Sequence, residues 1–444
     1  MTRTTSTARR AVRGAGAALA GALCLSVATA ASAAGAPTRT AEGQATPEPL
    51  STSERVDGID LTGTESVSEK APMLEPGVYS DRLTASEEGW RAYRVTRTAP
   101  GSTLHVSLTT QPTTYTDGSG QDAYEDLRIR LLAPDGTECY GDEVSAGDVG
   151  GISSFVTISA TVAGAYPKED ESAPEEACRA TGTFSVLVGR DGPQKSTPAE
   201  LQVLEEPPVT TLDDLPEPGE NHPSEVELPA REATPVRGAR RFTDAPEITS
   251  GTWSDTLVPG ETRVYRVKVD YGQTARFTAN GPTGGFRFPA DHELEDLWVE
   301  GLAYAPDRQL VDDSSTTGSF SSGSSSPQSV NTAPLRFRNR FADIGPSTSG
   351  MSGWYYYAVT VGEEDLGETL ADQPLKIAFT VDVEGKASDA VRYDHTAGDW
   401  GDPAEADEGM PGWLPWAGGG LLALAVLSGI AGFLLRRRLA GPRA

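Results

Sequence analysis

The chain has 444 residues, with 64 Asp or Glu against 37 Lys or Arg and a formal net charge of −27. This excess of acid repels polyanions, so nucleic acid is not an expected partner. The length allows more than one domain of ordinary size.

The first 33 residues predict a secretory signal peptide. Arginines precede the apolar run Ala15–Ala28, and small residues then lead to a cleavage site after Ala33. Cys24 follows Leu23 rather than the small residue that a lipoprotein signal requires, so a plain signal is expected. Its richness in Ala, Arg, Gly and Thr favours a bacterial source. The polar stretch 34–70 that follows is expected to be a disordered leader.

The middle of the chain contains a duplication. The segment Gly77–Leu83 (Gly-Val-Tyr-Ser-Asp-Arg-Leu) corresponds to Gly251–Leu257 (Gly-Thr-Trp-Ser-Asp-Thr-Leu). Further matches follow in the same order, about 170 to 174 positions apart, and chance similarity does not hold one offset through several matches. We therefore expect two copies of one module, residues 71–205 and 247–386.

Apolar residues in both modules recur at every second position. Leu104, Val106 and Leu108 alternate with polar residues, as do the apolar positions within 357–361. This period is typical of half-buried strands, and Pro/Gly turns separate them. The predicted fold class is all-β, with two tandem antiparallel β-sandwich modules of jelly-roll-like architecture. The same alternation places His105 on the outward face of its strand.

The order of strands and turns resembles the bacterial pre-peptidase C-terminal domain. The matching parts of the first copy are a Tyr-Arg-Val strand, a Pro-Gly turn, an Asp-Leu strand ending in Pro-Asp-Gly, and a late Gly-aromatic strand: Tyr93–Val95, Pro100-Gly101, Asp126–Gly136 and Gly182–Gly189. In the second copy Arg308 replaces the turn glycine, and a Ser/Gly-rich segment, 314–326, intervenes. The resemblance implies a jelly-roll-like sandwich of a family that includes processing appendages, adhesive modules and carbohydrate-binding modules.

Two cysteines lie in the exported part, Cys139 and Cys178, both in the first module. An even pair in an oxidising compartment predicts a disulfide. Closing a loop of about 40 residues contributes roughly 3 to 4 kcal/mol in the chain-entropy model. The second module has no cysteine, so the bridge reinforces the first copy alone.

An acidic loop of the first module offers candidate ligands for calcium. Asp117, Asp122, Glu125 and Asp126 supply the oxygen ligands that hard cations prefer. Their spacing is not that of an EF-hand loop, and a solvated turn leading into a strand is the favoured interpretation. No other cofactor is expected.

Residues 206–246, between the modules, are rich in proline and acidic residues and predict a semi-rigid linker. In the second module, Trp354, Tyr355 and Tyr356 belong to an aromatic run that places rings on both faces of one strand. Two or more exposed rings there would be able to stack on sugars or proteins, which makes these residues candidates for binding. The favoured interpretation is that one face fills the core and the other covers a sheet edge.

The C-terminus predicts a single membrane anchor. An acidic stalk, 387–411, leads to an uncharged apolar segment, 412–435, and a basic cytoplasmic tail, 436–444. The interfacial and basic residues that orient this anchor are Trp413, Trp416, Arg436, Arg437 and Arg438. Leu414–Gly418 resembles a sortase signal with Ala417 in place of threonine, so covalent attachment to the cell wall is the alternative.

The sequence gives little support to catalysis. His222 and His395 fall in the linker and the stalk, His292-Glu293 lacks the second histidine of a zincin, and no Gly-x-Ser-x-Gly elbow is present. The leading hypothesis is a non-catalytic cell-surface protein that binds an envelope component, a glycan or an exported protein. Alternatives are an accessory subunit of a membrane complex and, less favoured, an extracellular hydrolase.

Overall fold

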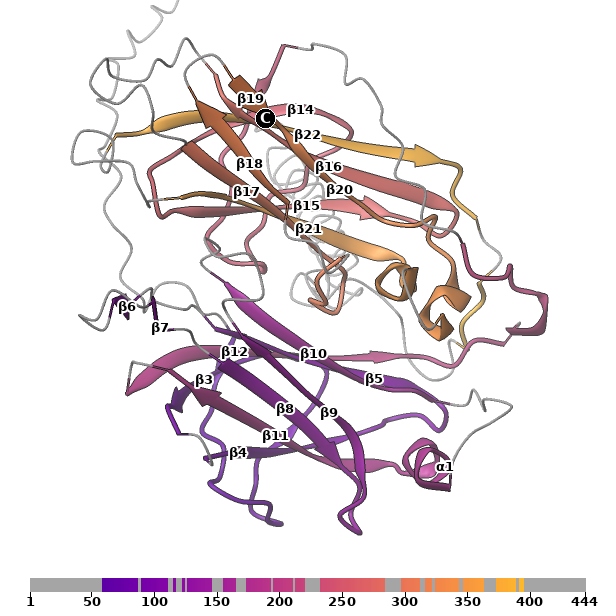
Figure 1. Ribbon diagram of the computed structural model, residues 1–444. Coiled ribbons are helices and arrows are strands. Elements are labelled where there is room, and N and C mark those ends of the chain that lie inside the picture. Colours follow the sequence, from indigo (N-terminus) through magenta and orange to yellow (C-terminus); the bar gives the residue numbers. More distant parts are fainter. Residues whose placement is uncertain are drawn as a thin grey trace, which may run out of the picture. The chain divides into compact units, whose positions relative to one another are not determined.

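The fold was analysed in a computed structural model (Figure 1). It describes residues 58–86, 89–110, 115–116, 122–123, 126–145, 155–164, 173–192, 195–210, 212–219, 232–283, 297–311, 316–321, 324–342, 346–362, 373–388 and 391–394. The predicted signal peptide, anchor and basic tail lie outside these residues. Within them, no helix is both long enough and apolar enough to cross a membrane.

The first half of the described chain contains two five-stranded sheets. Sheet A has the order β1 (Ile59–Asp60), β3 (Gly77–Thr84), β12 (Ser196–Glu206), β5 (Thr103–Thr110) and β10 (Val156–Val162). Sheet B has the order β2 (Met73–Leu74), β4 (Arg91–Thr96), β11 (Thr183–Asp191), β8 (Asp126–Leu132) and β9 (Glu138–Ser145). Apolar side chains of both sheets form one core, so the packing is sandwich-like.

The second half repeats this order, except that its second sheet has no described strand in the place of β2 and gains β19 (Ser324–Ser326) at the opposite edge. Sheet C runs β13 (Thr234–Pro235), β14 (Gly251–Leu257), β22 (Leu375–Gly385), β16 (Gln273–Pro282) and β20 (Gln328–Asn331). Sheet D runs β15 (Thr262–Val269), β21 (Gly353–Val361), β17 (Leu297–Tyr304), β18 (Thr316–Ser321) and β19 (Ser324–Ser326). The shorter elements are β6 (Tyr115–Thr116), β7 (Asp122–Ala123), α1 (Ala173–Ala180), η2 (Leu212–Asp214), η3 (Phe337–Phe341) and η4 (Pro346–Ser349). The described chain is predominantly β, as predicted.

Both halves share a buried lock between a tyrosine, an aspartate and a glycine. In the first half, Asp81 accepts hydrogen bonds from the Tyr93 hydroxyl at 2.7 Å and the Gly63 amide at 2.9 Å. In the second, Asp255 accepts the equivalent bonds from Tyr265 at 2.9 Å and from the Gly238 amide at 2.8 Å. The recurrence of the same three-residue contact gives the duplication a physical basis.

Glycine is required in this lock because a Cβ at Gly63 or Gly238 would lie 2.7 Å from the tyrosine ring. Each glycine follows a two-residue strand, β1 or β13, that pairs in parallel with β3 or β14. The segments predicted as a disordered leader and a linker therefore contribute residues that pair with the sheets. Strands of two residues are too short to show an alternating pattern.

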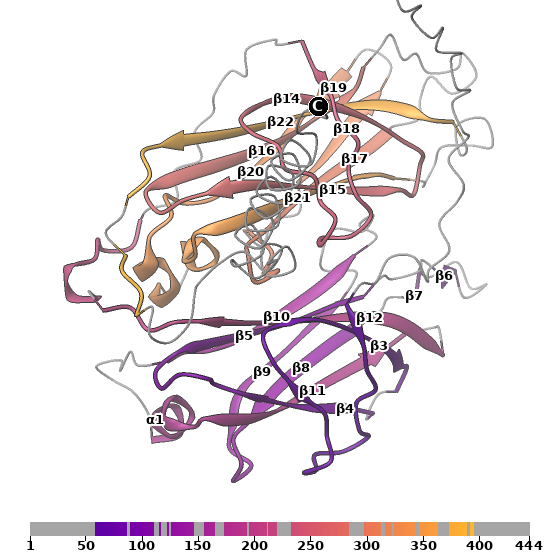
Figure 2. The same cartoon turned by 180° about the vertical axis from the view of Figure 1, so that it is seen from behind.

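The predicted disulfide between Cys139 and Cys178 is confirmed, and it ties β9 to α1. The helix lies at one end of the first half (Figure 2). Arg97, which is 8% exposed, holds the same end of the fold through backbone carbonyls. Its guanidinium donates to the carbonyls of Cys178, Arg179 and Thr181 at the end of α1, and of Val162 and Ala163 at the end of β10.

Candidate functional site

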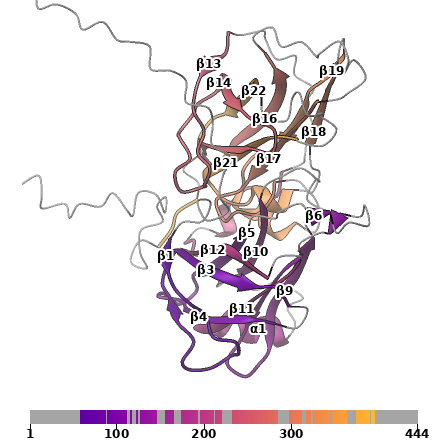
Figure 3. The same cartoon turned by 90° about the vertical axis from the view of Figure 1, so that its left-hand side faces the viewer.

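The two halves meet at the outward face of sheet A, which lies between sheet B and the second half (Figures 1 and 3). All eight residues of β5 are buried, and so are all residues of β12 except Ser196 and Glu205. The apolar core of the first half continues into Phe242, Leu302 and Tyr356 of the second. We call this contact the junction.

A half-buried strand was predicted at Leu104–Leu108, and for β5 this prediction is wrong. The neighbouring β12, which the alternation did not identify, is buried on both faces as well. The polar side chains on their outward faces are buried by the junction: His105, Ser107, Thr109, Glu200, Gln202 and Glu206. His105 lies on the outward face of its strand, as expected, but only 3% of it is exposed. A polar face that would suit solvent is thus covered by another part of the same chain.

Phe242 forms the aromatic centre of the junction. It belongs to the predicted linker, yet it is 2% exposed. Its ring centroid lies 5.5 Å from that of Phe155 in the first half, and 5.2 Å from those of Tyr304 and Tyr356 in the second. The contacts to the two tyrosines are edge-to-face, the arrangement that aromatic quadrupoles favour. The linker therefore contributes a contact shared by both halves.

Arg308 inserts a guanidinium side chain that is 1% exposed into the junction. Its guanidinium carbon lies 3.9 Å from the centre of the Phe242 ring and 4.6 Å from that of Tyr356. It donates to Gln202 at 3.2 Å and lies 3.6 Å from a Glu200 oxygen. Because Glu200 and Gln202 belong to β12, this one side chain of the second half pairs with two of the first.

The backbone at Arg308 is left-handed, with φ of +66°. Gly136, its counterpart in the first copy, has φ of +89°, as the turn after Pro-Asp requires. An arginine here accepts backbone strain that glycine would avoid. The buried contacts of its side chain explain why the second copy departs from the Pro-Asp-Gly pattern.

A second charged cluster surrounds His105. Its Nδ1 lies 3.2 Å from an Asp307 oxygen, and its Nε2 lies 3.5 Å from Glu206. Glu206 also accepts two hydrogen bonds from the Arg340 guanidinium and one of 2.8 Å from the Tyr393 hydroxyl. With His105 protonated, two carboxylates face two cations, so the buried cluster is electrically balanced.

The pKa values of the cluster follow from this pairing. Burial disfavours a charged imidazole, but the hydrogen bonds that the ring donates to Asp307 and Glu206 outweigh it and raise the pKa of His105 above its usual value. Burial would likewise raise the pKa of Glu206, but Arg340 and His105 lower it to about 2. Glu206 is therefore ionised at all ordinary pH values, and its charge favours protonation of His105.

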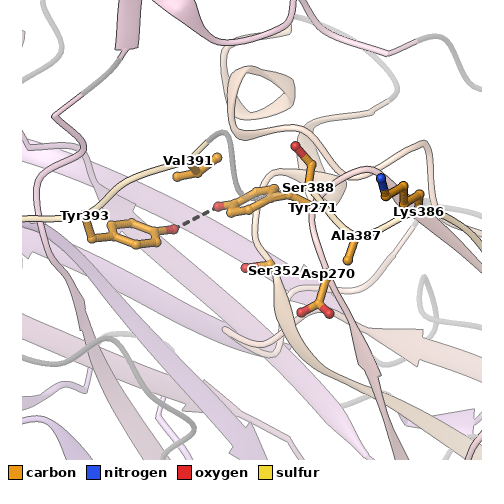
Figure 4. A pocket seen from close by; sticks show the side chains of 8 residues that line it. All are labelled: Asp270, Tyr271, Ser352, Lys386, Ala387, Ser388, Val391 and Tyr393. Atoms are coloured by element: carbon orange, nitrogen blue, oxygen red, sulfur yellow. Dashed lines mark hydrogen bonds between the residues drawn. The ribbon is translucent and has the colours of Figure 1, made fainter.

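The segment after β22 returns to the junction. Residues 391–394 pair with residues 208–210 through hydrogen bonds from the Thr210 amide to Arg392 at 2.8 Å and from the Asp394 amide to Pro208 at 2.7 Å. We call residues 391–394 the strap. Its Tyr393 hydroxyl lies 2.9 Å from that of Tyr271 (Figure 4). The strap thus connects the end of the second half to the His105 cluster.

Beside the strap lies a pocket of about 570 Å³. Its lining comprises Asp270, Tyr271, Ser352, Lys386, Ala387, Ser388, Val391 and Tyr393 (Figure 4). The mixture of a carboxylate, an ammonium group, two serine hydroxyls and two tyrosines suits a polar ligand with several hydrogen-bonding groups. We call it the strap pocket.

Glu300, in β17, is a buried acid whose carboxyl group has no hydrogen-bond partner among the described residues. It is 0% exposed. Its register neighbours are Thr317 and Thr360. Burial therefore raises the pKa of Glu300 well above its usual value.

Glu300→Gln is expected to make the protein more stable at neutral pH than the wild type. Below the ordinary pKa of about 4.5, glutamate is protonated in both states and carries no ionisation penalty. As the pH rises, the unfolded state ionises while the folded state holds the proton, so stability falls by about 1.4 kcal/mol per pH unit up to the folded pKa. Urea denaturation at pH 4.5 and 7.5 measures this difference.

Glu138→Gln is the matched control for this experiment. Glu138 has a half-exposed side chain 3.7 Å from Arg130, so its removal is expected to change stability little at either pH. If wild type and Glu300→Gln depend on pH to the same extent, the carboxyl of Glu300 is ionised in the folded protein and its assigned state is wrong.

The aromatic run of β21 does not expose the two rings that the binding candidate of the sequence requires. Tyr355 is 0% exposed and donates to the Met351 carbonyl, and Tyr356 is 4% exposed because it packs against Phe242 in the junction. Trp354 is half-buried, with Arg266 and Lys268 at 4.5 and 5.5 Å from its ring. The two faces of this strand fill the core and the junction.

The proposed calcium ligands are only partly described. Asp117 and Glu125 lie outside the described residues, the backbone of Asp122 belongs to β7, and Asp126 begins β8. Among the side chains that the structure describes, no group of three or more His, Cys, Asp or Glu is arranged to hold a metal ion. His222, His292 and His395 also fall outside the described ranges, as do Trp413, Trp416, Arg436, Arg437 and Arg438.

Comparison with known proteins gives weak likenesses. No protein-family model and no curated protein sequence matches the chain. An uncharacterised protein from Burkholderia cenocepacia is 13% identical over 70% of this chain and 81% of its own, with a TM-score of 0.19. Tripeptidyl peptidase 2 is 11% identical over 70% of this chain and 24% of its own, with a TM-score of 0.19. The ANX1 ectodomain from Arabidopsis thaliana is 10% identical over 72% of this chain and 87% of its own, at 0.18. Likenesses at this level carry no argument about function.

Proposed function

We propose that the chain is a non-catalytic exported protein, held in a membrane by one C-terminal helix, that binds an envelope component, a glycan or another exported protein. The observation that carries this proposal is the duplication of one β-module behind a secretory signal and ahead of an apolar segment with a basic tail. The acidic surface charge of the exported part suits such a location, because self-repulsion keeps it soluble.

The modules are proposed to be jelly-roll-like sandwiches of the pre-peptidase C-terminal type. The repeated strand order and the Tyr-Arg-Val and Pro-Asp-Gly elements support this assignment. Binding modules of all-β architecture hold the side chains that contact a ligand in preformed positions on a rigid scaffold. The strap pocket is the proposed ligand site, since its volume falls within the range of small-molecule sites and its hydroxyl, carboxylate and ammonium groups suit a polyhydroxylated ligand.

Fractionation of cells that produce the full chain tests the location. We expect the protein in the membrane fraction, released by detergent. Recovery in the wall fraction, resistant to detergent, would support the sortase route instead, and recovery in the medium would contradict the anchor. A stoichiometric partner that stays bound through detergent purification would favour the accessory-subunit function.

Binding is tested with the detergent-purified protein on isolated peptidoglycan and on a glycan array. Asp270→Asn and Lys386→Met are expected to weaken retention, whereas Asp135→Asn, at an exposed turn of the first half, leaves it unchanged. A panel of hydrolase substrates completes the test. Turnover that a single carboxylate substitution abolishes would overturn the non-catalytic function.

A further inference from the structure

The junction places a titratable imidazole between carboxylates of both halves. Glu206 comes from β12 of the first half, and Asp307 comes from the turn that follows β17 of the second. Thr161 of β10 lies 3.0 Å from the same Nδ1. We propose that this arrangement is a proton-dependent clamp, in which protonated His105 holds the two halves together and its deprotonation releases them. This inference does not depend on the ligand that the protein binds.

The charge balance of the cluster supplies the driving force. Arg340 of η3 is committed to Glu206 by two hydrogen bonds, so Asp307 depends on His105 for a cationic partner among the described residues. The other titratable groups around the cluster are tyrosines: Tyr140, Tyr271, Tyr355 and Tyr393, all with raised pKa values. They stay neutral while His105 titrates. Loss of its proton leaves two buried carboxylates facing one cation, an unfavourable arrangement in a low dielectric.

The composition of the junction indicates that it can open without unfolding either half. Sheets C and D of the second half share their own apolar cluster, and most of the first half's core comes from sheets A and B, although Phe242, Leu302 and Tyr356 of the second half also pack against it. Between them lie the polar side chains of β5, β10 and β12, including Gln202 Nε2 and Ser159 Oγ, which lack hydrogen-bond partners in the described part of the chain. Water can satisfy such groups when the halves separate, which offsets part of the cost of exposing the apolar residues that cross the junction.

The strap reports on the state of the clamp. Its Tyr393 donates to Glu206, and its backbone pairs with residues 208–210 through two hydrogen bonds. Opening of the junction removes the hydrogen bond from Tyr393 to Glu206, which joins this pairing to the first half, while the amides within the sheets keep their partners. Hydrogen–deuterium exchange of the peptides that contain Thr210 and Asp394 therefore separates opening from unfolding.

The experiment measures this exchange from pH 5.5 to 9.5 on the full-length protein in detergent, corrected for the intrinsic rate. His105 has a raised pKa, so the closed state is fully populated below about pH 6.5. Protection of Thr210 and Asp394 is expected to fall, by at most about tenfold per pH unit, as the pH rises from about 6.5 to the folded pKa of His105, and to level off above it. Protection of the β11 and β22 amides stays constant over the same range.

The duplication provides a matched pair of variants. Asp307 and Asp135 are equivalent turn residues, and each accepts a hydrogen bond from the amide two positions later, at 3.2 and 2.9 Å. Of these two aspartates, Asp307 is the one that contacts His105. Asp307→Asn is therefore expected to move the transition down by about one pH unit. Asp135→Asn should leave it in place, although it loses the same turn bond.

A titration of the imidazole carbon signals by NMR gives an independent measure, with the His105 resonance assigned through His105→Gln. Its midpoint is expected to match that of strap exchange in wild type and in Asp307→Asn. Strap protection that does not change with pH, equal midpoints in Asp307→Asn and Asp135→Asn, or an imidazole midpoint apart from the exchange midpoint would each overturn the clamp. The imidazole and exchange midpoints are measured on wild type, so they decide the matter even if a variant fails to fold.

Discussion

Replacing Arg308 by alanine is expected to destabilise the contact between the two halves by about 3 kcal/mol. The change removes a guanidinium that lies against two aromatic rings and deprives the buried Glu200 of a cationic neighbour. Removing one partner of a buried ion pair typically costs about 3 to 5 kcal/mol, and the 3.6 Å separation places this pair at the lower end. Calorimetry of the full chain is expected to show the two halves unfolding in separate steps.

Arg308→Gly is the informative second variant, because it removes the same side chain and also relieves the left-handed backbone. Alanine at φ of +66° retains strain of about 1 kcal/mol that glycine does not. The glycine variant is therefore expected to be the more stable of the two, even though glycine usually destabilises a fold relative to alanine. Arg130→Ala, at a half-exposed ion pair, is the control and should change stability by less than about 1 kcal/mol. If Arg308→Ala is as stable as Arg130→Ala, Arg308 does not stabilise the contact between the two halves and the prediction is wrong.

Substitution of Arg97 by methionine is expected to destabilise the first half by about 3 to 5 kcal/mol. Five backbone carbonyls, three from the end of α1 and two from the end of β10, accept hydrogen bonds from this one guanidinium. Buried acceptors without donors cost about 1 to 3 kcal/mol each, although water reaches some of them after the change. Loss of the positive charge at the helix C-terminus adds to the effect. Urea denaturation of the full chain, followed by exchange of the β11 amides, measures it.

Lysine at position 97 distinguishes the hydrogen bonds from the charge. A lysine keeps the cation but has three donors on one nitrogen, which cannot span both groups of carbonyls as the planar guanidinium does. Arg97→Lys is expected to lose more than half of what Arg97→Met loses. Arg94→Met, which removes a single hydrogen bond to the Ala71 carbonyl, is the control. A lysine variant with wild-type stability would mean that the charge alone matters.

The sequence predicts strands well where the cause of the pattern is local. The alternation of Leu104, Val106 and Leu108 reflects one face of β5 packed into the core, and the cysteine count identifies the disulfide. The duplicated Gly77–Leu83 segment predicts the repeated strand order because each copy must bury the same apolar positions.

The junction could not be predicted from the same patterns. Ser107, Thr109 and Gln202 are the residues that an exposed face would carry, and their burial depends on a surface that is distant in the sequence. Phe242 follows two arginines in a segment rich in proline and acidic residues, and it has no apolar neighbour at strand spacing. Arg308 gave the one available signal, an arginine where the turn requires glycine. A residue that the local backbone disfavours is expected where its side chain makes contacts outside the turn.

The pairing of residues 391–394 with 208–210 decides how the protein responds to mechanical load. A pull on the chain beyond Asp394 reaches the two backbone hydrogen bonds to Pro208 and Thr210 before it reaches β22. Force that enters from the C-terminal side is therefore carried from the outset by the segment that follows β12 as well as by β22. Detachment of residues 391–394 would absorb the first extension, and the sheets would remain folded during this step.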